Sequence, residues 1–398
     1  MSNERPHLFS PLTIRGGTLK NRIVLAPMCQ FSSNSGYVGD WHLVHLGKFA
    51  LGGFGTVLTE ATAIEPRGRI TLGDIGIWSD DFIPGLKRIT DFIRSQDTAP
   101  AIQIAHAGRK GGRQRPWHGD GPLGPEDAIR GEAPYGLVGP TDEAIDENCV
   151  TPEELTLGEI GEIVKRFADA AARAEAAGFE VIEIHGGHGY LISSFLSPGI
   201  NKRTDEYGGD RARRMRFGLE VAAAVRERWP RKPLFFRISA VDGDPNGWNI
   251  DDSVVFASEL KKRGIDIVDC SSGGMRGSGT NENAHRGPGY QVPLASEVKS
   301  RTGIATMAVG LILDGRQADK IVREGKADLI AIGRQAMYDP YWAHHAAQHI
   351  ESDPSFRGWD DQSGWYLQRR ARGLAQVGLR PDGTPLDSET CTNLSKSA

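Results

Sequence analysis

The chain has 398 residues and nearly balanced charge, with 47 Lys and Arg against 51 Asp and Glu and a net charge of -4. This balance gives no electrostatic reason to expect a nucleic-acid or membrane partner, and no apolar run approaches the length that spans a bilayer. The polar N-terminus lacks the apolar core of a signal peptide, and the four cysteines are widely spaced without a CxxC pair. We therefore expect a cytoplasmic protein with reduced thiols.

Residues 1–20 predict a short hairpin with Gly16–Gly17 at its turn, which we expect to plug the bottom of a barrel. Short segments that are apolar on both faces follow along the chain. This pattern is typical of parallel strands that are covered on each side. We place the strands at Ile23–Ala26, Thr56–Thr59, Ala101–Ile104, Val181–Ile184, Leu234–Ile238, Ile265–Cys270, Ala305–Val309 and Leu329–Ile332.

Amphipathic segments separate these strands, and the clearest runs from about Thr156 to Ala177. Thr156 and Glu159 form a candidate capping box, and Gly178 stands just past the end. Eight such alternations favour an α/β fold of the (β/α)8 TIM-barrel type. A doubly wound dehydrogenase would show a GxGxxG turn directly after a strand, and none of the proposed strands is followed by one.

The domain organisation follows from the same pattern. We expect a single TIM-barrel domain over residues 1–372. Residues 111–150, after the third strand, are rich in Gly, Pro and charge, and an excursion of this length predicts a cap over the site. Residues 373–398 are polar, and we expect them to form a loosely ordered C-terminal tail.

Polar residues and glycines follow the proposed strands at their C-terminal ends, which is the face that carries the active site in this fold. They are Met28–Cys29, Glu60, His106, His185 with His188, Arg237, Ser271–Ser272, Gly310 and Gly333–Arg334.

His185, His188 and Tyr190 come within six residues after a buried strand. One interpretation is a pair of N–H donors to a carbonyl or phenolate oxygen, with Tyr190 as the proton donor. A second is a metal site, because HxxH supplies two imidazoles, and a third is a structural role for both histidines. Further ligands for a metal would be His106, Glu60 and Asp269.

Two more groups of residues at the same face indicate a bound cofactor. Gly310, Gly333 and Arg334 follow the last two strands, where phosphate sites often lie in these barrels, although both glycines can also be simple turn residues. Gln103 and Arg237 can hydrogen-bond a heteroaromatic ring and stabilise negative charge on it. Arg237 can equally be an ion-pair partner in the core.

Cys29 follows Pro27–Met28 after the end of the first proposed strand and can be a nucleophile, a metal ligand, a modulator or an inert buried thiol. Lys110, next to Arg109, can steer an anionic cofactor or belong to a solvated charged face.

Seven motifs together are similar to one family. They are APMCQF (26–31), EATAIEPRGRIT (60–71), QIAHAGRK (103–110), HGGHGYLISSFLSP (185–198), NKRTDEYGG (201–209), DCSSG (269–273) and IGRQAMYDP (332–340). Occurring in this order, they resemble the old yellow enzymes, and specifically the thermophilic-like, xenobiotic reductase-like subclass of flavin ene-reductases. The similarity runs from about Leu8 to Trp342.

The resemblance implies a barrel that holds FMN non-covalently, with NADPH as the reductant and an activated alkene as the substrate. It implies that His185 and His188 bind the activating oxygen, that Tyr190 protonates the α-carbon, and that Cys29 tunes the flavin potential. Lys110 matches a lysine near the entrance that contacts substrate. The residues implied in cofactor binding are Pro27, Met28, Cys29, Ala61, Gln103, Arg237, Gly310, Gly333 and Arg334.

Two regions depart from the subclass pattern. Phe31 stands where many members carry a tyrosine that touches the ligand, so we expect a more apolar substrate site. Residues 365–373 resemble the segment that reaches into a neighbouring subunit's site, with Arg369 as the match for its inserted arginine. We therefore expect a homodimer or homotetramer, although the chain continues some 25 residues beyond this segment.

Two other functions compete with an NADPH-dependent ene-reductase. One is a metal-dependent barrel hydrolase that uses His185 and His188. The other is a flavin-binding or redox-sensing protein with reduced catalytic activity, for which Cys29, Phe31 and the tail leave room.

Overall fold

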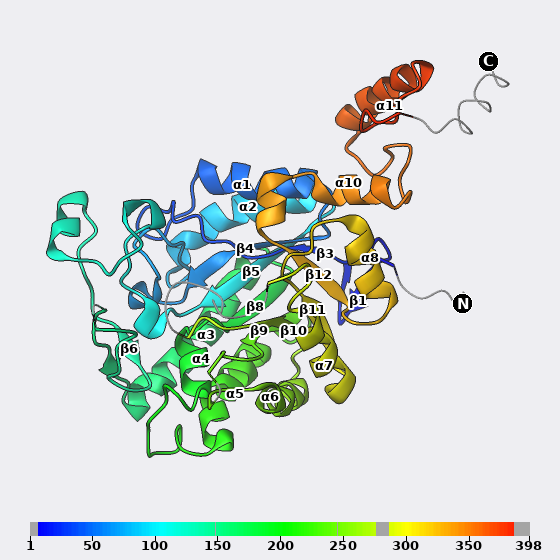
Figure 1. The fold of residues 1–398 in the computed structure, drawn as a ribbon. Helices are drawn as coiled ribbons and strands as arrows, with labels where there is room; N and C mark the ends of the chain where they lie inside the picture. The colour runs from blue at the N-terminus through cyan, green and yellow to red at the C-terminus, as the bar shows by residue number, and fades with distance from the viewer. Residues whose placement is uncertain (1–6, 148, 245, 276–285, 386–398) are drawn as a thin grey trace.

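The protein is described by a computed structural model over residues 7–147, 149–244, 246–275 and 286–385. Eight parallel strands close into a barrel in the order β10-β11-β12-β3-β4-β5-β8-β9, with helices around it (Figure 1). The strands are β3 Ile23–Leu25, β4 Thr56–Ala63, β5 Ala99–Ala105, β8 Val181–Gly186, β9 Leu234–Ser239, β10 Ile267–Ser271, β11 Ala305–Ala308 and β12 Leu329–Ile332. The predicted TIM barrel is confirmed, and every predicted strand is present.

Two of the strands include site residues that the sequence placed beyond their ends. β4 includes Glu60 and Ala61, because a register shift between Leu58 and Ala61 lets the strand keep pairing with β5. β8 includes His185, which pairs in register with Arg237 of β9. Ala61 and His185 are therefore held by strand pairing, whereas Glu60 lies at the irregularity of β4.

The N-terminal hairpin consists of β1 Leu12–Ile14 and β2 Gly17–Leu19. Because Ile14 pairs with Gly17, the turn residues are Arg15 and Gly16, so the prediction of Gly16–Gly17 is wrong. Arg15 adopts a positive φ of 50°, and its guanidinium binds Asp266 at 2.6 Å, a contact that local sequence does not reveal.

The hairpin closes one end of the barrel, as expected. Leu19 is buried in an apolar cluster inside the barrel, with Leu12 and Ile14 packed against that cluster. Its other members come from the barrel strands and include Val24, Leu58, Ala101, Val181, Phe235, Ile267, Met307 and Leu329. This plug layer, defined by the hairpin and these strand residues, is entirely apolar.

The helices follow the strands along the chain. They are α1 Asp40–Leu51, α2 Ile83–Ser95, α3 Leu157–Ala176, α4 Leu191–Leu196, α5 Arg211–Arg228, α6 Ile250–Lys262, α7 Val292–Thr302, α8 Gly315–Arg323, α9 Arg334–Tyr338, α10 Trp342–His349 and α11 Asp361–Gln376. The predicted start of α3 is confirmed, since Thr156 and Glu159 form a reciprocal capping box.

The excursion after β5 lies at the end of the barrel opposite the hairpin (Figure 1). It contains 3-10 turns, η4 Pro116–His118 and η5 Pro125–Arg130, and a two-residue strand β6, Val138–Gly139, that pairs with β7, Glu153–Glu154. The absence of a helical period in the sequence agrees with these short turns. Its role as a cap stays a prediction.

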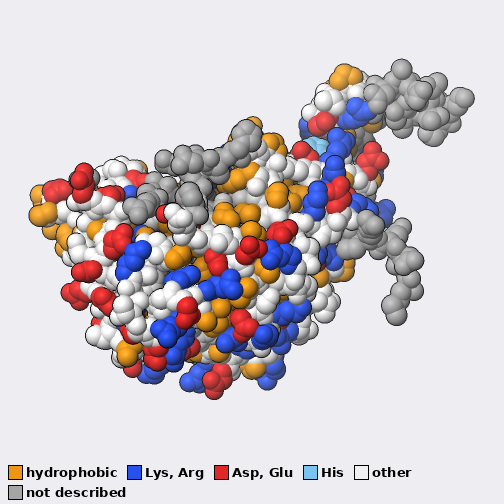
Figure 2. Space-filling view, turned by 60° about the horizontal axis from the view of Figure 1, so that its bottom comes forward, with side chains coloured by type: hydrophobic (Ala, Val, Ile, Leu, Met, Phe, Trp, Pro, Cys, Tyr) orange, Lys and Arg blue, Asp and Glu red, His pale blue; other side chains and the backbone are white. Residues whose placement is uncertain are grey.

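The C-terminal helix α11 projects away from the barrel (Figure 1). The expected boundary at residue 372 lies inside this helix, which continues to Gln376, and residues 386–398 of the expected tail lie outside the described residues. On the face drawn in Figure 2, Lys and Arg side chains lie among Asp and Glu, in agreement with the balanced charge. Each helix of the described ranges is too short or too polar to traverse a bilayer.

Candidate active site

A layer of charged and polar side chains lies inside the barrel above the apolar plug. Gln103 of β5 stands beside Glu183 of β8, and Arg237 of β9 stands beside Asp269 of β10. The Gln103 amide donates to Glu183 Oε1 at 2.8 Å, and Arg237 Nε lies 3.1 Å from Asp269 Oδ2. All four residues are buried, and we call them the charged layer.

The charged layer contains two carboxyl groups and one guanidinium. Burial, followed by the neighbouring Asp269 charge, raises the pKa of Glu183 to about 8, and burial also raises the pKa of Asp269. Glu183 therefore tends to hold a proton at neutral pH. Arg237 Nε, Glu183 Oε2 and both Asp269 oxygens have no hydrogen-bond partner, and Arg237 also borders the open cavity described below. Arg237 is thus both an ion-pair partner in the core and a residue that borders the cavity, the two roles that the sequence left open.

His185, His188 and Tyr190 come together at the barrel mouth. The His185 ring lies 5.1 Å from the His188 ring and 5.0 Å from the Tyr190 ring. The Gly187 backbone N–H donates to His185 Nδ1 at 3.3 Å, so Nε2 carries the proton and can donate to a ligand. Burial lowers the pKa of both histidines and raises the pKa of Tyr190, so the imidazoles are neutral and the phenol keeps its proton.

His188 is held by groups from two neighbouring strands. Its backbone N–H donates to Ser239 Oγ at 2.8 Å, and its Nε2 lies 2.7 Å from Ser271 Oγ. Ser271 and Ser272 in turn donate to Gln291 Oε1 at 3.2 and 2.8 Å. His188 also has a positive φ of 58°, so tertiary contacts fix both its backbone and its ring.

Lys110 lies beneath Tyr190 and is buried. Its ammonium donates to the carbonyls of His188 and Gly274 at 2.9 and 2.6 Å and lies 5.3 Å from the Tyr190 ring centre. Burial is the main cause that lowers its pKa to about 7. Lys110 therefore ties together the loops after β8 and β10, and its contact with substrate stays a prediction.

One cavity of about 190 Å³ connects the histidine side of the mouth with the last two strands. Gly310 has a positive φ of 111°, and a side chain there would collide with Tyr290 and Gln291. Gly333 is different, because a Cβ there would meet no protein atom closer than 3.7 Å, which leaves its surroundings open for a ligand. Predicted cofactor residues that line this cavity are Pro27, Met28, Arg237, Gly310, Gly333 and Arg334.

Cys29 and Ala61 lie on the other side of the mouth. Ala61 lines a small cavity together with Tyr190 and Asp74. Burial and then the charges of Asp74 and Glu60 raise the pKa of the Cys29 thiol, which is partly exposed. A thiol in these surroundings is a poor nucleophile at neutral pH.

Phe31 lies after β3 beside the excursion, whereas Arg369 lies on the C-terminal helix α11. Phe31 has a positive φ of 50°, its carbonyl accepts from Arg115, and its ring lies 6.2 Å from the Trp117 ring of the excursion. Arg369 lies on α11 with its guanidinium 3.9 Å from the Trp365 ring, away from the barrel of its own chain (Figure 1). Arg369 therefore does not reach the mouth of its own chain, and the contact of Phe31 with a ligand stays a prediction.

In the described ranges, no three His, Cys, Asp or Glu side chains lie close enough together to bind a metal ion. His106, a possible third ligand, is bound to Glu65 at 2.6 Å.

Two residues that line the cavity could not be identified from the sequence. They are Tyr290 and Gln291, which precede α7 and do not follow a strand, so no strand-end pattern marks them. Ser239 could have been found, since it follows Arg237 at strand spacing.

This arrangement defines a TIM-barrel oxidoreductase of the flavin-binding class. The open cavity at Gly333 suits a phosphate, the cationic Arg237 borders the same cavity, and donors for a substrate oxygen lie at its edge. The residues present thus fit FMN.

The comparisons agree. The model of the NADH:flavin oxidoreductase / NADH oxidase family matches residues 7–353, so the chain belongs to that family. It is 42% identical over 359 residues to an NADPH dehydrogenase of Geobacillus sp. (strain WCH70), covering 88% of this chain and 98% of the relative. The Bacillus subtilis NADPH dehydrogenase is 42% identical over 348 residues, covering 87% of this chain and 96% of the relative.

Solved structures support the same fold. A 2-naphthoyl-CoA reductase complex is 26% identical with a TM-score of 0.77, covering 88% of this chain and 53% of that one. An old yellow enzyme homologue from Zymomonas mobilis is 23% identical with a TM-score of 0.70, covering 88% and 94%. The resemblance to old yellow enzymes is confirmed, and the chain is an NADPH dehydrogenase type of flavin oxidoreductase with FMN as its cofactor. The metal-dependent hydrolase is not supported.

Proposed function

We propose that this enzyme reduces C=C bonds that are conjugated to a carbonyl group. When bound and reduced by NADPH, FMN supplies the hydride that adds to the β-carbon of the alkene. The chain supplies the oxygen-binding donors and the proton, so that one hydride and one proton together saturate the bond. The observation that carries this proposal is the neutral His185 beside the protonated Tyr190, with ring centres 5.0 Å apart at the barrel mouth.

The roles of the side chains follow from their hydrogen bonds. His185 Nε2–H is free to donate to a substrate oxygen, because its Nδ1 accepts a backbone N–H. His188 gives its Nε2–H to Ser271 Oγ, whose own proton goes to Gln291, so the neutral ring becomes a second donor to the substrate only when its proton is carried on Nδ1. Hydrogen bonds to the oxygen draw electron density from the β-carbon. Tyr190 then donates its proton to the α-carbon, and its raised pKa ensures that this proton is present.

The substrate class is consistent with the relatives and with the rim. The name 2-naphthoyl-CoA reductase describes an acceptor in which an unsaturated ring is conjugated to a thioester carbonyl. In this chain Phe31 and Trp117 form an aromatic edge near the mouth. We therefore propose that apolar enones and related carbonyl compounds bind well.

We also propose that the enzyme is a homodimer or homotetramer in which α11 contacts a neighbouring chain. Within α11 only Gly364 is buried, whereas Trp365 and Tyr366 are 49% and 69% exposed. Exposed aromatic residues on a projecting helix are typical of an interface. Arg369, on the same helix, then supplies a cation to the neighbouring site.

Anaerobic spectroscopy tests the main proposal. The protein should carry a flavin spectrum that bleaches with NADPH and recovers when cyclohexenone is added. Bleaching without recovery by any enone would favour the redox-sensing alternative. A protein that binds zinc stoichiometrically and cannot be reconstituted with FMN would contradict the proposal.

A further inference from the structure

The loop that carries Cys29 is held by two consecutive residues of β4. At the register shift between Leu58 and Ala61, Glu60 Oε2 accepts the backbone N–H of Gln30 at 2.8 Å. The next residue, Ala61, directs its backbone N–H to the Cys29 sulfur. The irregularity in β4 therefore fixes the residue after the thiol and the thiol itself.

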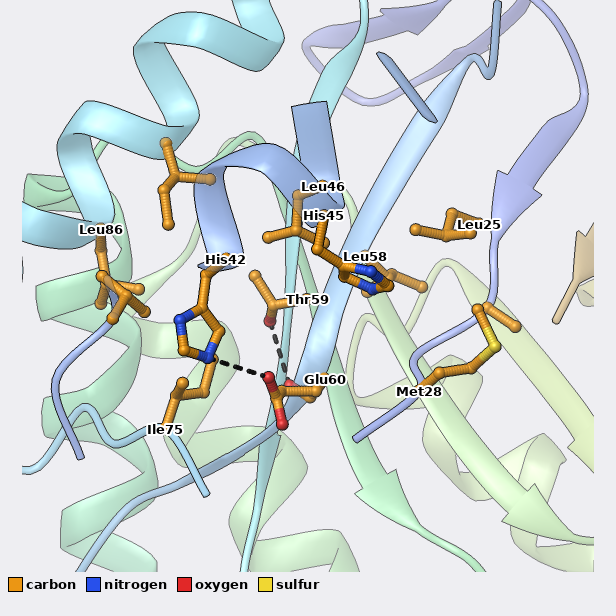
Figure 3. A pocket seen from close by; sticks show the side chains of 13 residues that line it. Leu25, Met28, His42, His45, Leu46, Leu58, Thr59, Glu60, Ile75 and Leu86 are labelled. Carbon is orange, nitrogen blue, oxygen red and sulfur yellow. Dashed lines mark hydrogen bonds and ion pairs between the residues drawn. The ribbon is translucent and has the colours of Figure 1, made fainter. Parts of the chain in front are cut away.

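His42 of α1 lies beside the Glu60 carboxylate without a hydrogen bond between them. His42 Nε2 lies 3.4 Å from Glu60 Oε1, and both side chains are buried (Figure 3). The Gly39 backbone N–H donates to His42 Nδ1 at 3.0 Å, so the proton on the ring is at Nε2, toward Glu60. The adjoining cavity of about 10 Å³ holds at most one water, and apolar side chains such as Leu46, Leu58, Ile75 and Leu86 surround it. Little solvent is present to screen the carboxylate.

The charged groups that act most strongly on the Cys29 thiol are carboxylates. Burial, Asp74 and then Glu60 raise its pKa. Asp74 is fixed by the Ile70 N–H at 2.7 Å, and burial raises its own pKa to about 7. Burial keeps Tyr190 as a neutral phenol and lowers the pKa of His45 to about 4, so the phenol adds no negative charge and the imidazole no positive charge near the sulfur at neutral pH.

We propose that Glu60 is a positioning residue for Cys29: it anchors the Gln30 backbone and, with Asp74, places negative charge behind the sulfur, so that Cys29 remains a thiol. This state has a consequence for the proposed substrates, on which this part of the inference rests. A thiolate adds through sulfur to the β-carbon of an enone, and the α-carbon then takes a proton, which leaves a covalent adduct. Keeping Cys29 as S–H protects the enzyme from its own substrates.

The test measures alkylation of Cys29 in the FMN-free full-length chain between pH 6 and 10. Iodoacetamide and cyclohexenone are used as separate probes, and peptide mass spectrometry distinguishes Cys29 from Cys149, Cys270 and Cys391. Glu60→Gln removes the charge but keeps an oxygen that can accept from Gln30. We expect both probes to modify Cys29 about tenfold faster at pH 8 in this variant, with the inflection of the pH profile moved to lower pH.

Glu60→Asp and Glu220→Gln are the matched variants. Glu60→Asp keeps the charge and shortens the reach to Gln30, so its inflection should stay near that of the wild type. Glu220→Gln removes a charge from the outer helix α5 and should change nothing. Asp74→Asn supplies a second loss of charge at the thiol and should also speed alkylation.

The outcomes separate the possibilities. Folding of each variant is checked first by thermal unfolding. Superimposed pH profiles for wild type, Glu60→Gln and Asp74→Asn would overturn the proposal, as would an equal shift in Glu220→Gln. If iodoacetamide shows the shift and no enone is ever reduced by the holoenzyme, Glu60 keeps its role and only the proposed function fails. In the holoenzyme, Glu60→Gln should also develop long-wavelength thiolate-to-flavin absorbance at a lower pH than the wild type.

Discussion

The charged layer and the plug layer fill the same barrel, one above the other, with opposite chemistry. The plug consists of side chains such as Leu19, Phe235 and Met307, which need no partner beyond close packing. The charged layer keeps Glu183, Arg237 and Asp269 out of water with an incomplete set of hydrogen bonds. Burial of unpaired charge is costly, so a layer of this kind is retained for what it binds and not for stability.

The contrast also explains why the two layers follow each other within single strands. On β9, Phe235 belongs to the plug, and Arg237, two residues later, belongs to the charged layer. Side chains two apart point to the same face of a strand, so one step along the barrel axis separates the two functions.

The largest effect should come from removing the single cation of the charged layer. In Arg237→Met, Asp269 loses its counter-charge, and we expect the FMN-free protein to lose about 3–5 kcal/mol of unfolding free energy in urea. FMN retention should fall as well. Arg237→Lys keeps the charge and should recover much of the stability. Unchanged stability of Arg237→Met would show that the layer does not depend on this ion pair.

Stability should also fall as pH rises. The folded-state pKa of Glu183 is about 8, above its ordinary value of 4.5, so the stabilisation is complete below about pH 4.5 and is lost as pH rises toward 8. The decrease should be on the order of 2–4 kcal/mol. In Glu183→Gln, the unfolding free energy measured in urea should change less between pH 5 and 9 than in the wild type. If it falls as steeply as in the wild type, a group other than Glu183 loses the proton.

A change in the plug should affect stability without affecting the site. Leu19→Ala removes buried methyl groups, and we expect a loss of about 2–3 kcal/mol with the flavin spectrum and the rate of reduction by NADPH unchanged. A shifted flavin spectrum in this variant would mean that the two layers are coupled.

The smallest effect on stability should come from the loss of a single oxygen atom at the mouth. Tyr190→Phe leaves the ring in place and removes the proton, so enone reduction by the reduced enzyme should slow by about 100-fold. Reduction of the flavin by NADPH should stay within about twofold, because Tyr190 donates only to the substrate. Stopped-flow measurement of the two half-reactions separates them, and equal slowing of both would contradict the role of proton donor.

Local patterns in the sequence were sufficient for the barrel and for much of the mouth. Segments that are apolar on both faces located the strands, because parallel strands of a barrel are buried on both sides. The capping box of α3 depends only on Thr156 and Glu159, three residues apart, so it can be read without the fold. His185, His188 and Tyr190 were identified because strand ends collect at one face of this architecture.

Tertiary structure decided the rest, since these features depend on residues far apart in the chain. The turn at Arg15 follows from its bond to Asp266, and the burial of Lys110 follows from the carbonyls of His188 and Gly274. The contact of Glu60 with the Cys29 loop requires a break in the register of β4, which the regular alternation of strand residues cannot predict. The sequence by itself determined which residues can carry the chemistry, and only the packing of neighbouring strands decided which of them hold a proton, a charge or a partner.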